Sequence, residues 1–71
     1  MRSAAARRTK ADAVRRARAL RSELSFLIDE LSKPGPPDDA AERCANTIFE
    51  RSRALEYVVR DLVRKGRNNG A

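Results

Sequence analysis

Residues 33–39, KPGPPDD, decide the fold of this 71-residue chain, because they hold all three of its prolines. Proline removes a backbone hydrogen-bond donor and restricts the residue before it, so a helix does not continue through this stretch. The sequence therefore predicts two helical segments, one on each side of a loop at residues 34–38.

Before the loop, apolar residues recur at alternating spacings of four and three, which places them on one stripe of a helix. Thr9, with Asp12 three residues later, is typical of a helix N-terminus. The predicted first helix covers residues 10–33. Its stripe consists of Ala13, Ala17, Leu20, Leu24, Leu27 and Leu31.

After the loop the same spacing continues with one interruption, at Ser52, and predicts a second helix over residues 39–65. Asp38 and Asp39 supply an N-terminal cap and favourable negative charge, and Gly66 supplies a C-terminal stop. The second stripe consists of Ala41, Ala45, Ile48, Leu55, Val59 and Leu62.

The two helices are expected to form an all-α antiparallel hairpin, because the loop is short. Flexible tails are predicted at residues 1–9, which are basic, and at residues 66–71. A chain of this size buries only about 60% of its unfolded surface, and one cysteine allows no internal disulfide. Because both helices carry a heptad-like repeat, we expect the stripes to form the seam of a homodimeric four-helix bundle.

Charge is distributed unevenly along the chain, which carries +6 in total. Residues 1–22 have eight basic side chains and one acidic, residues 23–42 have one and six, and residues 43–71 have seven and three. The hairpin would therefore have a basic open end and an acidic loop end. This asymmetry favours antiparallel packing of two hairpins, with a parallel bundle as the alternative.

The sequence contains no pattern typical of an enzyme or of a cofactor site. With no histidine and one cysteine, no metal site is expected. Cys44 lies at the edge of the second stripe and is interpreted as a small buried hydrophobic residue. No apolar run exceeds a few residues, so we expect no contact with a membrane and a cytoplasmic location.

Arginine accounts for 13 of the 16 basic residues, and its planar guanidinium suits phosphate recognition. A GC-rich genome would produce the same Ala/Arg-rich composition. Basic residues project opposite the first stripe with no acid expected to relieve them, and on the second helix they alternate with a tyrosine. Such a pattern is typical of phosphate contact and base stacking. The candidate nucleic-acid-binding residues are Arg8, Arg15, Arg18, Phe26, Arg53, Tyr57, Arg60 and Arg64.

Three interpretations of these residues stay open. The first is a non-enzymatic regulatory module that binds nucleic acid, RNA in preference. The second is an ordinary solvated surface in which Glu56–Arg60 and Asp61–Lys65 are pairs at helical spacing. The third is a small subunit or adaptor, whose seam packs against the helices of a larger protein or whose basic surface meets an acidic one.

Residues 17–22, residues 27–31 and Cys44 are similar to parts of the Rop family of plasmid RNA-binding proteins. Residues 17–22, ARALRS, look like the Ala-Arg-x-x-Arg-Ser stretch of that family's first helix, and residues 27–31, LIDEL, are similar to the segment that ends it. Cys44 falls near the family's helix 2 cysteine. The resemblance spans residues 8–60. It implies an antiparallel homodimeric four-helix bundle that binds pairs of RNA hairpins through the outer face of the first helix.

The family's RNA-binding positions are matched only in part. Arg8 stands in place of a lysine and Arg15 in place of an asparagine. The central phenylalanine, a glutamine and a second lysine fall on Ala19, Glu23 and Glu30. Phe26 lies one heptad further along the same face. The resemblance therefore supports the bundle more than the RNA activity.

Overall fold

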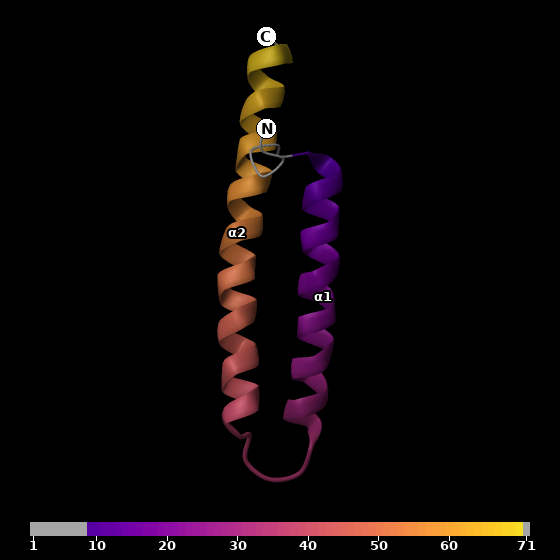
Figure 1. The fold of residues 1–71 in the computed structure, drawn as a ribbon, viewed down its shortest axis with the longest axis vertical. Coiled ribbons are helices and arrows are strands. Elements are labelled where there is room, and N and C mark those ends of the chain that lie inside the picture. The colour runs from indigo at the N-terminus through magenta and orange to yellow at the C-terminus, as the bar shows by residue number, and fades with distance from the viewer. Residues whose placement is uncertain (1–8, 71) are drawn as a thin grey trace, which may run out of the picture.

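The structure, a computed structural model, describes residues 9–70, except for the side chains of residues 69 and 70. Helix α1 (Lys10–Ser32) and helix α2 (Asp39–Gly70) lie side by side and antiparallel, joined by one loop (Figure 1). No strand occurs in this part of the chain. The predicted all-α helical hairpin is confirmed. Residues 1–8 of the predicted N-terminal tail lie outside the described residues.

Both helices begin at side-chain caps. The Thr9 hydroxyl accepts a hydrogen bond from the Asp12 backbone N–H at 3.1 Å. The Asp38 carboxylate accepts bonds from the backbone N–H groups of Ala40 and Ala41 at 3.1 and 3.2 Å. Each cap satisfies amides that have no partner within their own helix. The sequence predicted both of these starting points.

The loop begins with an extended residue and turns at a glycine. Lys33, at φ −71° and ψ 150°, follows the last helical residue of α1. Its ammonium group donates to the Glu30 carboxylate at 2.7 Å, and this hydrogen bond raises the pKa of Lys33. Gly35 has φ +87°, in the left-handed region that favours glycine. Glycine has no Cβ, so it adopts this conformation without strain.

The end of α2 differs from the expectation. The helix continues through Gly66 to Gly70 instead of stopping after residue 65, and it extends beyond the start of α1 (Figure 1). A glycine ends a helix when it adopts positive φ, and among the described glycines only Gly35 does so. Gly66 instead stays helical, at a propensity cost of about 1 kcal/mol relative to alanine.

The contact between α1 and α2 is narrow. Its buried apolar side chains are Ala41, Cys44 and Val58, which are 4%, 7% and 3% exposed. Cys44 is buried as predicted, and its thiol lies 3.5 Å from the Glu23 backbone carbonyl, to which it donates. Across the same contact, the Arg51 guanidinium donates to the Glu23 carboxylate at 3.1 Å. Polar groups therefore share a contact with very little apolar volume.

The twelve predicted seam residues separate into two groups. Those buried or half-buried along the helix contact are Ala13, Leu20, Leu27, Ala41, Ile48, Leu55 and Leu62. Those exposed are Ala17, Leu24, Leu31, Ala45 and Val59. The 4-3 spacing marks a stripe wider than one neighbouring helix covers, and the hairpin uses only one edge of it. Val58, outside the predicted stripe, is buried in place of Val59.

Candidate functional site

The outer side of α2 carries a row of aromatic rings and guanidinium groups in contact. The Arg53 guanidinium carbon lies 5.9 Å from the ring centroid of Phe49 and 5.9 Å from that of Tyr57. The Arg60 guanidinium carbon lies 5.4 Å from the Tyr57 centroid. Spacings of three and four residues place all four on one side of the helix. We call Phe49, Arg53, Tyr57 and Arg60 the stacking strip.

Hydrogen bonds hold the strip in place while its rings stay accessible. Arg53 donates to the Tyr57 hydroxyl at 3.2 Å, and this bond raises the pKa of Arg53. Arg60 donates to the Glu56 carboxylate at 2.7 Å. The rings of Phe49 and Tyr57 belong to residues that are 59% and 45% exposed. Because each cation–π contact contributes only about 0.5–1 kcal/mol at an exposed site, another planar group could displace the guanidinium groups from these rings at low cost.

The structure brings together three of the four candidates predicted on α2. Arg53 and Arg60 each contact the ring of Tyr57, and Arg64 is an exposed neighbour one turn after Arg60. Phe49 was missed by the sequence reasoning. The signal was present, because Phe49 precedes Arg53 by the same four residues that separate Arg53 from Tyr57.

On α1, the expectation that no acid relieves the basic cluster is wrong. Asp12 forms ion pairs with both Arg15 and Arg16, the latter at 3.0 Å. The hydrogen bond from Arg16 and the charges of both arginines hold the pKa of Asp12 below its ordinary value. Spacings of three and four residues bring both arginines to one carboxylate. Arg8, the remaining basic candidate near this cluster, lies outside the described residues.

The α1 candidates do not join the stacking strip on one surface of the single chain. Arg15 lines a groove of about 410 Å³ between the helices, together with Arg51 from the inner side of α2. The strip lies on the side of α2 that faces away from α1, as the helical repeat requires. Arg18 and Phe26 are exposed on α1, with Phe26 at 49%. Candidates from the two helices are therefore separate features.

One side of the hairpin exposes apolar side chains along both helices, with Arg21, Ser52 and Glu56 among them. We call this side the apolar face, and it lies about 100° around each helix from the contact between them. From α1 it includes Val14, Ala17, Leu24, Ile28 and Leu31. From α2 it includes Ala45, Phe49, Ser52, Val59 and Val63. Both sets repeat at heptad-like spacings, and Arg21 and Glu56 are the charged residues within them.

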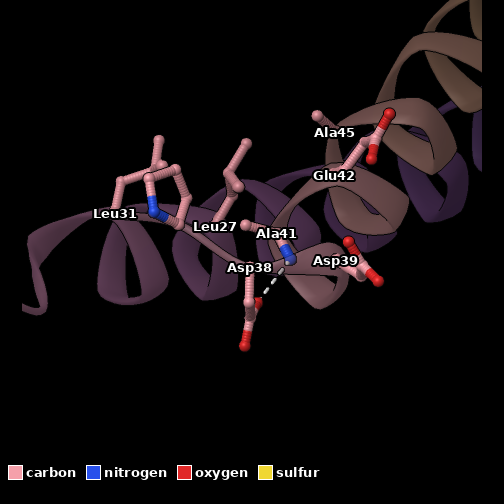
Figure 2. Close-up of a pocket in the computed structure, with 8 residues that line it drawn as sticks. Leu27, Leu31, Asp38, Asp39, Ala41, Glu42 and Ala45 are labelled. Carbon is pink, nitrogen blue, oxygen red and sulfur yellow. Dashed lines mark hydrogen bonds between the residues drawn. The ribbon is translucent and has the colours of Figure 1, made fainter. Parts of the chain in front are cut away.

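Two hollows show that the α1 and α2 parts of the apolar face lie on the same side of the hairpin. At the loop end, Leu27 and Leu31 line a hollow of about 390 Å³ with Ala41 and Ala45. Figure 2 shows the two leucines pointing to the side on which Ala45 lies. At the open end, a second hollow is lined by apolar residues of both helices, among them Val14, Val59 and Val63.

The charges divide between the two halves of the hairpin. Residues 10–21 and 51–68, which form the open half, carry eleven basic and three acidic side chains. Residues 22–50, which form the loop half, carry two basic and seven acidic side chains. The described residues thus give the hairpin a strongly positive half and a negative half, and the stacking strip lies mostly in the positive one.

Neither helix is both long enough and apolar enough to cross a membrane. Between Thr9 and Asn68, no group of three His, Cys, Asp or Glu side chains is arranged to hold a metal ion. Burial raises the pKa of the Cys44 thiol, with Glu23 adding to the effect, so this cysteine is a poor nucleophile.

Comparisons with family models, with curated proteins and with solved structures gave no match to this chain.

Proposed function

We propose that the chain is a non-enzymatic cytoplasmic regulatory module that forms a homodimeric four-helix bundle and binds nucleic acid, with RNA preferred. The observation that carries the nucleic-acid assignment is the exposed Tyr57 ring, which lies between the Arg53 and Arg60 guanidinium groups. An aromatic ring flanked by cations offers a nucleic acid both stacking and phosphate contact. Arg64 extends the same basic edge.

The apolar face supports the bundle part of the proposal. Monomeric proteins rarely expose contiguous apolar patches of large side chains unless the patch contacts a partner. Ile28, Leu31 and Val63 are each at least half exposed, at 62%, 57% and 50%. Pairing of two hairpins would remove these side chains from water and leave the basic edges outside.

The resemblance to the Rop family points to the same architecture but to a different helix. It implies RNA contacts on the first helix, where Arg15 is paired with Asp12 and where alanine occupies the central aromatic position. The contacts that suit RNA here lie on α2. The proposal therefore assigns RNA binding to the stacking strip and takes only the bundle from the resemblance.

A salt titration of RNA binding tests the assignment. Log affinity for single-stranded RNA should fall linearly with log salt concentration, because phosphate contacts release counterions. Arg53→Gln with Arg60→Gln should flatten the slope by roughly one to two units. Tyr57→Leu should cost about 1–3 kcal/mol with little change in slope if a base stacks on the ring. Lys33→Gln, at the loop, is the control for loss of one positive charge away from the strip.

Two results would overturn the proposal. Absence of RNA and DNA binding by the wild type at about 50 mM salt would leave the strip as a solvated surface. A wild-type chain that is monomeric and poorly helical at micromolar concentration would favour the adaptor function, in which the apolar face packs on a larger protein.

A further inference from the structure

We propose that two copies of this chain pair head to tail through their apolar faces, so that their stacking strips lie side by side and together bind one RNA strand. The identity of the ligand rests on the proposed function. The composite site does not exist in a single chain, and each copy contributes half of it.

A second copy fits the apolar face because the face repeats the spacing by which the helices already pack. Leu24 and Ile28 of α1 and Val59 of α2 are 43%, 62% and 43% exposed, on heptad-like stripes about 100° from the existing contact. Two neighbours at about that angle are what each helix of a four-helix bundle has. A patch that packs on the same patch of a second chain gives a closed dimer with two-fold symmetry.

The charge distribution selects the orientation of the two copies. With loops at the same end, two halves with eleven basic and three acidic side chains would lie together. With loops at opposite ends, each such half lies beside a half with two basic and seven acidic side chains. Like charges repel and opposite charges attract at these separations, so the head-to-tail arrangement is favoured and weakens as salt screens it.

The orientation determines which helices become neighbours. In the head-to-tail dimer the two-fold axis is perpendicular to the helices and parallel to the apolar faces. It therefore packs α2 on the second copy's α2 and α1 on the second copy's α1. The strip points about 90° from the apolar face and away from α1. Both strips therefore point to the same side of the dimer. If the loops lay at one end, α2 would pack on the second copy's α1 and the strips would lie on opposite edges.

The spacing suits a single strand. The α2 part of the apolar face runs from Ala45 to Val63, so its midpoint is residue 54. If these stretches overlap fully, the two Tyr57 residues are six residues apart along the axis, roughly 9 Å, on helices about 8–10 Å apart. Phe49, which belongs to both the strip and the apolar face, would be covered by the second copy, so Arg53, Tyr57 and Arg60 of each strip would contact the RNA.

Hybrid dimers test the composite site. One wild-type chain is refolded with one Arg53→Gln/Tyr57→Leu chain, and the hybrid is separated by different affinity tags. Binding of a single-stranded RNA of about 12 nucleotides, within the usual range of site sizes, is then measured. Because both strips hold one strand, the hybrid should bind at least about tenfold more weakly than wild type. A hybrid with a Lys33→Gln chain should bind like wild type.

The stoichiometry gives the second readout. Wild type should bind one strand per two chains. A hybrid that retains wild-type affinity with half the sites would show that each strip acts alone and would overturn the proposal. If the wild-type dimer binds no RNA at all, the proposed function fails, and the arrangement of the chains is decided by crosslinking.

Crosslinking uses single cysteines on the apolar face in a Cys44→Ala background. With a short bis-maleimide reagent, the cysteine of Ser52→Cys should crosslink to the same cysteine of the second chain, because the α2 helices of the two chains would pack on each other. A mixture of Ser52→Cys and Ala17→Cys chains should give no crosslink between the two sites. Crosslinking between residues 17 and 52, without the 52–52 product, would place α2 on α1 and overturn the inference.

Discussion

The contact between α1 and α2 and the apolar face are both stripes of apolar residues, yet they differ in what they contain. The contact buries Ala41, Cys44 and Val58 and includes the Glu23–Arg51 ion pair. The face exposes larger side chains, among them Ile28 and Leu31. Apolar burial is the main favourable term in folding. The single hairpin thus leaves much of its stabilising surface exposed, and the proposed pairing would cover that surface.

Truncation of the apolar face should give the largest effect. Leu24 and Phe26 are similarly exposed in the hairpin, at 43% and 49%, but only Leu24 belongs to the face. Leu24→Ala should lower the free energy of unfolding by about 2–5 kcal/mol per chain, because the proposed dimer would bury this leucine. Phe26→Ala should change it by less than about 0.5 kcal/mol. Urea titrations followed by circular dichroism at several protein concentrations measure both, and equal shifts would contradict burial of the face.

Truncation within the hairpin contact should cost less. Val58→Ala removes two buried methyl groups, with a transfer term of about 1.5 kcal/mol and a small cavity term, for a total near 2 kcal/mol. The proposed dimer should nevertheless persist in sedimentation at micromolar concentration, because Val58 does not belong to the apolar face. A monomeric Val58→Ala protein would mean that the two stripes are not separable.

Gly35 and Gly66 should respond to substitution in opposite directions. Gly66 is helical, and a Cβ added there would meet nothing within 4 Å. Gly66→Ala should therefore stabilise α2 by about 0.5–1 kcal/mol. Gly35→Ala should destabilise by roughly 1 kcal/mol, because φ is +87°. Thermal melts of the two variants measure this difference. If Gly66→Ala is the destabilising change, the helix stops near residue 65 after all.

The smallest effect concerns acid. The pKa of Asp12 is lowered from 3.8 by Arg16 and Arg15, so the ionised form stabilises the folded state. This contribution is fully present above pH 4 or so and is lost as pH falls through the lowered value. Asp12→Asn should reduce the loss of helicity in acid. The control substitution Asp29→Asn, at an exposed position, should leave that loss unchanged. Identical acid titrations of the two variants, followed by circular dichroism, would show that Asp12 does not contribute to the pH dependence of stability.

The sequence predicted the elements well because their signals are local. The prolines at the loop, the cap at Thr9 and the 4-3 repeats depend on neighbours along the chain. The rotation of each helix about its own axis was not predictable in the same way. A wide apolar stripe can pack against a neighbouring helix along either edge. Val58 and Val59 differ in burial only because the actual contact lies toward one edge.

The candidate site shows the same division. The Arg53–Tyr57–Arg60 contacts follow from spacing within one helix, and the sequence reasoning found them. Arg51 was missed because its partner, Glu23, lies on the other helix. The pairing of Arg15 with Asp12 is also local, but it was not predicted, because Asp12 was interpreted only as part of the helix N-terminus. Arg8 lies outside the described residues and stays a prediction.

Separated charge makes one hairpin an electric dipole, with its positive pole at the open end. Head-to-tail pairing sets two such dipoles against each other, and the two-fold axis cancels them along the rod. The field of a polyanion would then orient a single chain with its open end toward the polyanion. The pair has no net dipole along the helix axes, so it would not be oriented in this way and could bind along its side. Protein concentration, which sets the fraction of paired chains, would therefore change the orientation in which the protein approaches RNA.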